Sequence, residues 1–203
     1  MTETPYTYYE NTDDGLLFAA EISWRGIAIE LQELHYLHGA RFVNQLKLIT
    51  YYGDFHPVEG EMGIFSTGGE KSEDYANLLD AARKAVEHGY RVFLLPNPKG
   101  FRTADFIFER KGVYKMFDLK TISGKSSASS RLQESIGQTN HVVLNMVTNY
   151  NPRLLAKDVQ FYFEANKNAR EVLIIKGSKF LSVSRRFVEG KDYIKMFMKR
   201  YLK

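Results

Sequence analysis

The sequence predicts an α/β protein, in which a mixed sheet is flanked by helices and preceded by an acidic, mainly helical N-terminal extension. Three observations support this class. Apolar residues recur at helical spacing in the first quarter of the chain. From residue 72 onward, helical patterns alternate with short apolar runs typical of strands. Residues 104–122 form two alternating runs around a Lys-Gly turn, which indicates a β-hairpin. With 203 residues, 44% of them hydrophobic, the chain can bury a full core.

The N-terminal part predicts one long helical segment with a break. Apolar residues such as Ile27, Leu31 and Leu34 recur at helical spacing from 22 to 49, and Gly39 interrupts them. Residues 42–52 are also compatible with a strand. The glycine-rich stretch that follows, 53–69, predicts a loop or short strands. We therefore expect an acidic extension over 1–71, a core over 72–176 and a basic C-terminal tail over 177–203.

The core begins with a helix. Ser72-Glu73-Asp74 resembles a helix start with acids where the helix dipole favours them, and Gly89 is a suitable end. The predicted order from there is helix, three strands, helix, strand, helix, strand. These elements are a helix from 72 to 89, strands 90–95, 104–110 and 113–122, a helix over 129–139, a strand 141–146, a helix 152–166, a strand 171–175, a further strand 180–183 and a basic helical tail.

The hairpin carries the clearest indication of function. A turn at Lys111-Gly112 places Asp105 directly opposite Asp118, and opposed residues project to one face with Cβ atoms roughly 4.5–5.5 Å apart. Lys120 shares that face because strand side chains alternate. Two carboxylates and an ammonium at one spot cost stability unless a cation, most simply a divalent metal, joins them.

The charge of the chain is unevenly distributed. Residues 1–82 carry 4 Lys and Arg against 14 Asp and Glu, whereas residues 83–131 carry 11 against 4. Residues 176–203 carry 9 basic side chains against 2 acidic ones. The candidate acidic pair therefore lies inside a basic stretch, which favours a polyanionic partner, usually nucleic acid. The alternative is that the basic segments are simply solvated faces.

Several classes of protein are disfavoured. The chain has no cysteine, so disulfides and thiolate zinc sites are excluded. Its longest apolar runs are too short to span a bilayer, and its first residues lack the basic start of a secretory signal. We expect a soluble, cytoplasmic protein without a membrane partner. His35 and His38 lie one turn apart but have no evident third ligand.

The hairpin and its surroundings resemble the PD-(D/E)xK nuclease superfamily. That superfamily has a core of helix, three strands, helix, strand, with an acid on the second strand and an (Asp/Glu)-x-Lys on the third. Asp105 and Asp118-Leu119-Lys120 match this pattern, although Thr103-Ala104 stands where the motif's proline is expected. The runs ADFIFERKGVYKMFDLKTISG and RLQESIGQTNHVVLNM look like toxin nuclease domains at the C-termini of contact-dependent growth-inhibition (CdiA-like) proteins, and like related modules of phages and conjugative elements.

The resemblance implies a metal-dependent nuclease acting on DNA or tRNA, the two being unresolved by the sequence. Mg²⁺ is the expected metal, with Mn²⁺ or Zn²⁺ as alternatives, held by Asp105, Asp118 and the backbone carbonyl of Leu119. Lys120 would orient or help deprotonate the attacking water. The remaining residues it implies are an acid near the start of the first helix (Glu73, with Asp74 and Asp80 as alternatives), Gln138 as a catalytic glutamine, and the phosphate contacts Lys99, Arg102, Lys125 and Arg131.

Arg131, Ser135 and Gln138 would share one face of the second core helix, towards phosphate or water. A toxin of this kind would have an immunity protein as partner, or the acidic N-terminal extension could cover the basic cleft within the chain. Two further functions stay open: a metal-independent ribonuclease that uses a histidine and a lysine, and a non-catalytic nucleic-acid-binding module.

Overall fold

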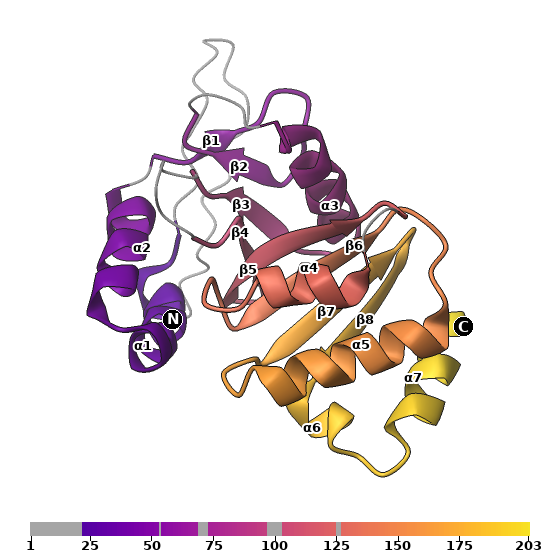
Figure 1. Cartoon of the computed structure of the whole chain (residues 1–203). Coiled ribbons are helices and arrows are strands. Elements are labelled where there is room, and N and C mark those ends of the chain that lie inside the picture. Colours follow the sequence, from indigo (N-terminus) through magenta and orange to yellow (C-terminus); the bar gives the residue numbers. More distant parts are fainter. Residues whose placement is uncertain (1–21, 53, 69–72, 97–102, 125–126) are drawn as a thin grey trace.

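A computed structural model describes the chain except for residues 1–21, 53, 69–72, 97–102 and 125–126. The described residues form one mixed eight-stranded sheet with helices on both faces, so the predicted α/β class is confirmed (Figure 1). The elements are α1 (Trp24–His38), α2 (Ala40–Tyr52), β1 (His56–Pro57), β2 (Ile64–Ser66), α3 (Tyr75–Glu87), β3 (Arg91–Leu94), β4 (Phe106–Arg110), β5 (Val113–Ile122), α4 (Ala128–Glu134), β6 (His141–Met146), α5 (Pro152–Ala165), β7 (Glu171–Lys176), β8 (Lys179–Ser184), α6 (Arg185–Val188) and α7 (Tyr193–Leu202).

The eight strands lie in the sheet in the order in which they occur in the chain. The pairs β2–β3, β5–β6 and β6–β7 are parallel, and the other neighbours are antiparallel. Parallel neighbours need a crossover connection, which α4 supplies between β5 and β6 and α5 between β6 and β7. From α3 to β6 the chain therefore runs through helix, three strands, helix and strand, as expected.

Residues 24–52 are helical apart from a break at Gly39, whose φ is +86°. Residues 42–52 belong to α2, so the alternative of a strand there is not realised. The predicted boundary at residue 71 does not divide the sheet, because β1 and β2 precede it and β2 pairs with β3. The described part of the N-terminal extension is thus continuous with the core.

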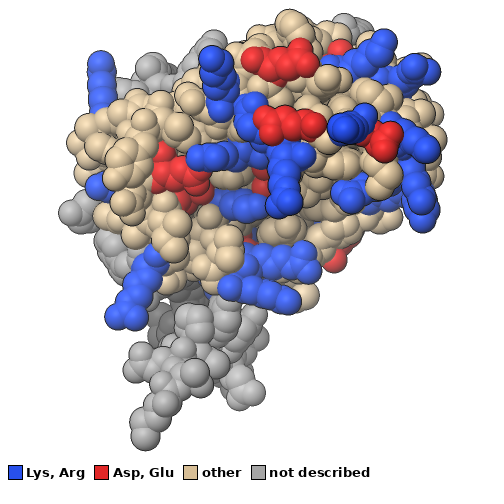
Figure 2. Space-filling view, turned by 90° about the horizontal axis from the view of Figure 1, so that it is seen from below, with Lys and Arg blue, Asp and Glu red and all other residues tan. Residues whose placement is uncertain are grey.

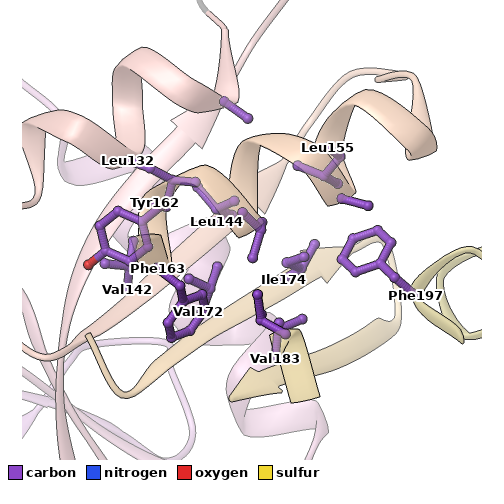
Figure 3. Close-up of a cluster of buried hydrophobic side chains, with 14 of the residues drawn as sticks. Leu132, Val142, Leu144, Leu155, Tyr162, Phe163, Val172, Ile174, Val183 and Phe197 are labelled. Atoms are coloured by element: carbon purple, nitrogen blue, oxygen red, sulfur yellow. The ribbon is translucent and has the colours of Figure 1, made fainter. Parts of the chain in front are cut away.

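The two faces of the sheet carry separate apolar clusters. On one face α3 packs with Ala81, Ala82 and Ala85 against strand residues such as Phe106 and Phe117. On the other face α1 and α2 cover β3 to β5, forming a cluster that includes Ile27, Leu31, Phe93, Ile107 and Met116. Beside it α4, α5 and α7 cover β5 to β8 (Figure 3), with a cluster that includes Leu132, Leu144, Tyr162, Ile174 and Phe197.

The expected C-terminal tail is part of this packing. β8 pairs with β7, and Val183, Phe197 and Tyr201 are buried in the cluster under α5 and α7. Among the described residues, no helix combines the length and the apolar character that crossing a bilayer would require.

Candidate functional site

The predicted register of the hairpin is confirmed. Arg110 pairs with Val113, and Phe106 pairs with Phe117 at the other end of β4. The two turn residues have positive φ, 54° at Lys111 and 78° at Gly112, as a type I′ turn requires. Asp105 directly precedes the paired residues of β4; its N–H donates to the Phe117 carbonyl at 2.9 Å, and its side chain interacts with that of Asp118.

Strand alternation decides which side of the sheet these groups occupy. Asp118 and Lys120 share the face of Met116 and Ile122, whereas Phe117 faces α3. Met116 belongs to the cluster under α1 and α2, and Ile122 to the cluster under α4 and α5. The two polar residues between them therefore lie where the two apolar clusters meet.

The contacts among these groups are short. Lys120 Nζ donates to Asp118 Oδ1 at 3.0 Å, and its distance to Asp118 Oδ2 is 2.8 Å. That second contact is an ion pair without hydrogen-bond geometry, so the buried Oδ2 accepts no hydrogen bond within the described residues. Asp105 Oδ2 accepts the Leu119 N–H at 2.7 Å. The hairpin thus fixes both carboxylates through its own backbone and Lys120.

Burial disfavours the ionised form of both acids. For Asp118, burial and the neighbouring Asp105 raise the pKa to about 7, against the opposing charge of Lys120. For Asp105, burial also raises the pKa, and the Leu119 N–H and Lys120 only partly oppose this. Burial is the main cause in both cases, and for Asp118 the neighbouring acid adds to it.

The acids line a cleft with a volume of about 680 Å³. It lies at the C-terminal part of β5, where the ends of β2 and β3, the first turn of α3 and the region of α4 converge. Predicted site residues that line it are Asp105, Asp118, Leu119, Lys120, Arg131 and Gln138. The sheet and both flanking helical layers therefore contribute to one opening.

Other predicted residues lie elsewhere. Glu73 is exposed and does not line the cleft, whereas its neighbour Asp74 does, and the charge of Asp74 adds to the raised pKa of Asp105. Asp80 is bound to Lys84 and Asn145 beneath α3, with contacts of 2.6 and 2.8 Å. The structure thus brings Asp74 to the cleft, not Glu73. Lys99, Arg102 and Lys125 lie outside the described residues.

The second core helix is shorter than expected. α4 ends at Glu134, so Gln138 lies in the following turn and donates through Nε2 to the Glu134 carbonyl at 2.9 Å. Ser135 is fully buried and donates to the Leu132 carbonyl at 2.7 Å, so its expected position towards phosphate is wrong. Arg131 lines the cleft while it pairs with Glu134 at 2.9 Å.

Sequence reasoning missed part of the lining. Ser66 and Thr67 reach the cleft from the end of β2, and Tyr75 and Asn77 reach it from the first turn of α3. The available signal was their position: polar residues directly after a strand or at a helix start often line a site. Without the pairing of β2 with β3, nothing in the sequence places residues 66 and 67 beside the hairpin.

The donor set suits a hard cation. Asp105, Asp118 and the Leu119 carbonyl offer oxygen atoms only, and no histidine is among the described residues that line the cleft. In the described part of the chain, no three His, Cys, Asp or Glu residues are grouped closely enough to hold a metal. A metal here would therefore take two carboxylates from the protein and complete its shell with carbonyl oxygen and water, as Mg²⁺ commonly does.

Comparison with known proteins gives little. No family model matches the chain, and no curated protein matches it. A solved structure, the "CdiA-CT/CdiI toxin and immunity complex from Burkholderia pseudomallei", aligns with a TM-score of 0.40 and 16% identity, covering 59% of this chain and 98% of that chain. Similarity at this level does not establish a shared activity.

Proposed function

We propose that the chain is a metal-dependent nuclease with a restriction-endonuclease-like core, which hydrolyses phosphodiester bonds of DNA or tRNA. The observation that carries the proposal is the pair of buried carboxylates with Lys120 at a cleft, at the spacing of the PD-(D/E)xK motif. The order α3, β3, β4, β5, α4, β6 agrees with the order that this superfamily implies.

The raised pKa of Asp118 supports the proposal that a divalent metal binds at this site. A site that holds two acids and one lysine is under-neutralised at neutral pH, and a divalent cation is the simplest compensation. Asp105, Asp118 and the Leu119 carbonyl would hold Mg²⁺, or Mn²⁺, which takes the same oxygen ligands; Zn²⁺ is the less suited alternative, because no histidine or cysteine lines the cleft among the described residues. When bound, such an ion lowers the pKa of coordinated water and neutralises phosphate charge.

Side chains of the protein would bind the substrate and orient the attacking water. Lys120, held by Asp118, is placed to orient a water or to balance charge that develops on the phosphate. Arg131 and Gln138 line the same cleft and would position the phosphodiester. Asp74, at the start of α3, is a better candidate than Glu73 for the acid contributed by the first core helix.

The competing functions make different demands on the site. A metal-independent ribonuclease would need a histidine at the cleft. His141 is instead buried beside Glu30, and His38 hydrogen-bonds Asn140 at 2.9 Å. A non-catalytic module needs no clustered carboxylates at all, and such a cluster opposes the binding of a phosphate unless a cation is present. The geometry therefore favours the metal-dependent enzyme.

The test is incubation of the protein with plasmid DNA and with total tRNA, in Mg²⁺, Mn²⁺, Zn²⁺ or EDTA. We expect cleavage only with a divalent metal, and a loss of roughly 10²-fold or more in Asp118→Asn and Lys120→Ala. Lys111→Asn, at the exposed turn of the same hairpin, is the matched control and should keep full activity. Cleavage that persists in EDTA would reject the metal, and no cleavage of either substrate would favour the non-catalytic module.

We further propose that the nuclease acts as a growth-inhibition toxin with an immunity protein as partner. This rests on the likeness of the hairpin and α4 sequences to such toxin domains. Expression in bacteria should arrest growth, and Lys120→Ala should remove the effect without lowering the amount of protein. Growth that continues with the wild-type protein present in folded form would argue for a role outside toxicity.

A further inference from the structure

We propose that the outer sides of α5 and α7 form a second contact surface for nucleic acid, remote from the cleft. This C-terminal basic surface comprises Arg153 and Lys157 on α5, Lys191 before α7, and Lys195, Lys199 and Lys203 along α7. The choice of nucleic acid as its polyanion rests on the proposed function. The surface itself is defined by charge and packing alone.

The two helices are held together in a fixed arrangement. Tyr193 Oη donates to the Ala156 carbonyl at 2.9 Å, and Phe197 is fully buried in the cluster shared by α5 and α7. Between the helices lies a hollow of about 510 Å³, whose rim carries Arg153, Lys191 and Lys195. Most of the basic side chains therefore project from two helices that are packed together, with Lys191 in the connection before α7.

The spacing of the lysines is regular. Lys195, Lys199 and Lys203 follow one another at intervals of four residues, so they lie on one side of α7 at steps of about 6 Å. Lys191 extends the row beyond the start of the helix. A row of cations of this kind can follow a chain of phosphates without reading its sequence.

The charge of this surface is not neutralised within the protein. In the described residues, Lys157, Lys191, Lys195 and Lys199 make no ion pair, whereas Lys84, Lys115 and Lys120 each have a carboxylate partner. Figure 2 shows Lys and Arg side chains spread over one face of the molecule, with acidic side chains at several places among them. Such a face repels itself and attracts a polyanion.

Other basic residues of this region have internal roles. Arg185 donates to the carbonyls of Phe163 and Asn166 at 3.1 and 2.6 Å, and Lys176 lies over the Tyr201 ring at 4.9 Å. These two are excluded from the surface for that reason. What remains is the set of lysines on the outer sides of the helices.

Composition favours nucleic acid over an acidic protein. Lysine is depleted in protein–protein interfaces but is a standard phosphate contact, and four of the six cations on this surface are lysines of residues 191–203. Phe161 on the same helix as Lys157 is 53% exposed, which offers a ring on which an unpaired base could stack. The combination of exposed cations and an exposed ring is typical of nucleic-acid contact.

The surface is separate from the cleft, because no residue of α5, α6 or α7 lines the cleft. Binding and cleavage can therefore be measured independently. A substrate long enough to reach both would gain affinity from the basic surface, whereas a short substrate would use the cleft alone.

The test measures binding of the full chain in EDTA, by fluorescence anisotropy with a labelled 30-base-pair DNA duplex and with labelled tRNA. We expect Lys195→Glu/Lys199→Glu to weaken binding by about tenfold and to lower the salt dependence (the slope of log K against log salt) by roughly 1.8 for the duplex. Arg25→Glu/Lys47→Glu changes the net charge equally on exposed positions of α1 and α2, and should change affinity by less than about twofold.

Lys195→Gln/Lys199→Gln is a second variant for the case that the charge-reversed protein misfolds. It should show a smaller loss of affinity in the same direction. Equal losses of affinity in the α7 and the α1/α2 variants would overturn the proposal of a basic binding surface, because net charge alone would then explain binding. Wild-type protein that binds polyglutamate but neither nucleic acid would overturn it in favour of an acidic protein. Binding that depends on α7, without cleavage in any metal, would support the surface and reject the nuclease.

Discussion

At the scale of single residues, Asp118 sets the chemistry of the site. Its carboxylate is almost fully buried, faces Asp105, and has Lys120 as its partner. Burial and the second acid raise its pKa to about 7, so the folded protein binds this proton more tightly than the unfolded chain does. Ionisation of the buried Asp118 carboxylate therefore destabilises the folded protein, and a cation bound beside it would stabilise the ionised form.

This makes stability fall as pH rises through a defined window. Between the usual aspartate pKa near 4 and about 7, the native state holds a proton that the unfolded chain has lost, so the free energy of unfolding decreases with rising pH. The slope from this group is at most about 1.4 kcal/mol per pH unit. Chemical denaturation of the metal-free protein at pH 5, 6, 7 and 8 measures it.

Asp118→Asn isolates the effect, because its amide does not titrate. The difference in unfolding free energy between wild type and this variant should shift against wild type from pH 5 to pH 8. Adding Mg²⁺ at pH 8 should stabilise wild type and leave the variant unchanged. Parallel pH profiles for the two proteins would show that Asp118 ionises normally.

At the scale of elements, the turn of the β4–β5 hairpin controls the site. Lys111 and Gly112 both have positive φ, and the Gly112 N–H donates to Glu109 Oε1 at 2.7 Å. If the pairing of β4 with β5 slipped by one residue, Asp118 would point to the face of the sheet that α3 covers and would no longer meet Asp105. The turn, distant from the cleft, thus determines whether the two acids meet.

Gly112→Val tests this connection. A β-branched residue at a φ of 78° should cost about 1–3 kcal/mol of stability and should lower cleavage in the assay above more than the loss of folded protein explains. Lys111→Asn is the control, since asparagine tolerates positive φ and should change stability by less than about 0.5 kcal/mol. Full specific activity of the folded Gly112→Val protein would separate the turn from the site.

The docking of α1 depends on a buried acid. Glu30 accepts the Met116 N–H of β5 at 3.0 Å and lies 3.2 Å from His141 Nδ1. Glu30→Ala should therefore destabilise the protein by about 2–4 kcal/mol, because it leaves a strand N–H buried without an acceptor. Thermal or urea unfolding measures this.

Glu33→Ala provides the comparison one turn away. Glu33 pairs with Arg170 at 2.6 Å, but both side chains are partly exposed, so its removal should cost less than about 1 kcal/mol. Equal costs for the two alanine variants would mean that the contact of Glu30 with β5 contributes little.

At the scale of the whole molecule, the site lies at the meeting of two halves. The N-terminal helices cover one half of a sheet face, and α4, α5 and α7 cover the other, with Asp118 and Lys120 between the two clusters. Removing either cover would expose the strand that carries both residues. The described part of the extension is thus part of the fold that holds the site.

Deletion of residues 1–71 should accordingly unfold the core and not merely uncover the cleft. It removes α1, α2, β1 and β2, exposing Phe93, Ile107 and Met116 to water. We expect loss of near-UV circular dichroism, binding of a hydrophobic dye and loss of the cooperative melt. A deleted protein that melts cooperatively with raised nuclease activity would restore the idea of an inhibitory extension.

The local parts of this picture could be predicted from the sequence. The hairpin register follows from a two-residue turn and strand alternation, both of which act over neighbouring residues, and the same holds for the break at Gly39 and the strands β5 and β6. The predicted end of this helix, residue 139, lies too far along the chain, since α4 ends at Glu134. Ser135 is buried against Leu132 and Tyr162, and the spacing of apolar residues in the sequence does not indicate this contact.

The sequence by itself determined that Asp105, Asp118 and Lys120 share one face, because the geometry of a tight turn leaves little freedom. Only the tertiary structure decided which side of the sheet that face is, that Asp74 and not Glu73 reaches the cleft, and that β2 belongs to the same sheet. Those outcomes depend on contacts between residues far apart in the chain, where burial of apolar surface outweighs local preference.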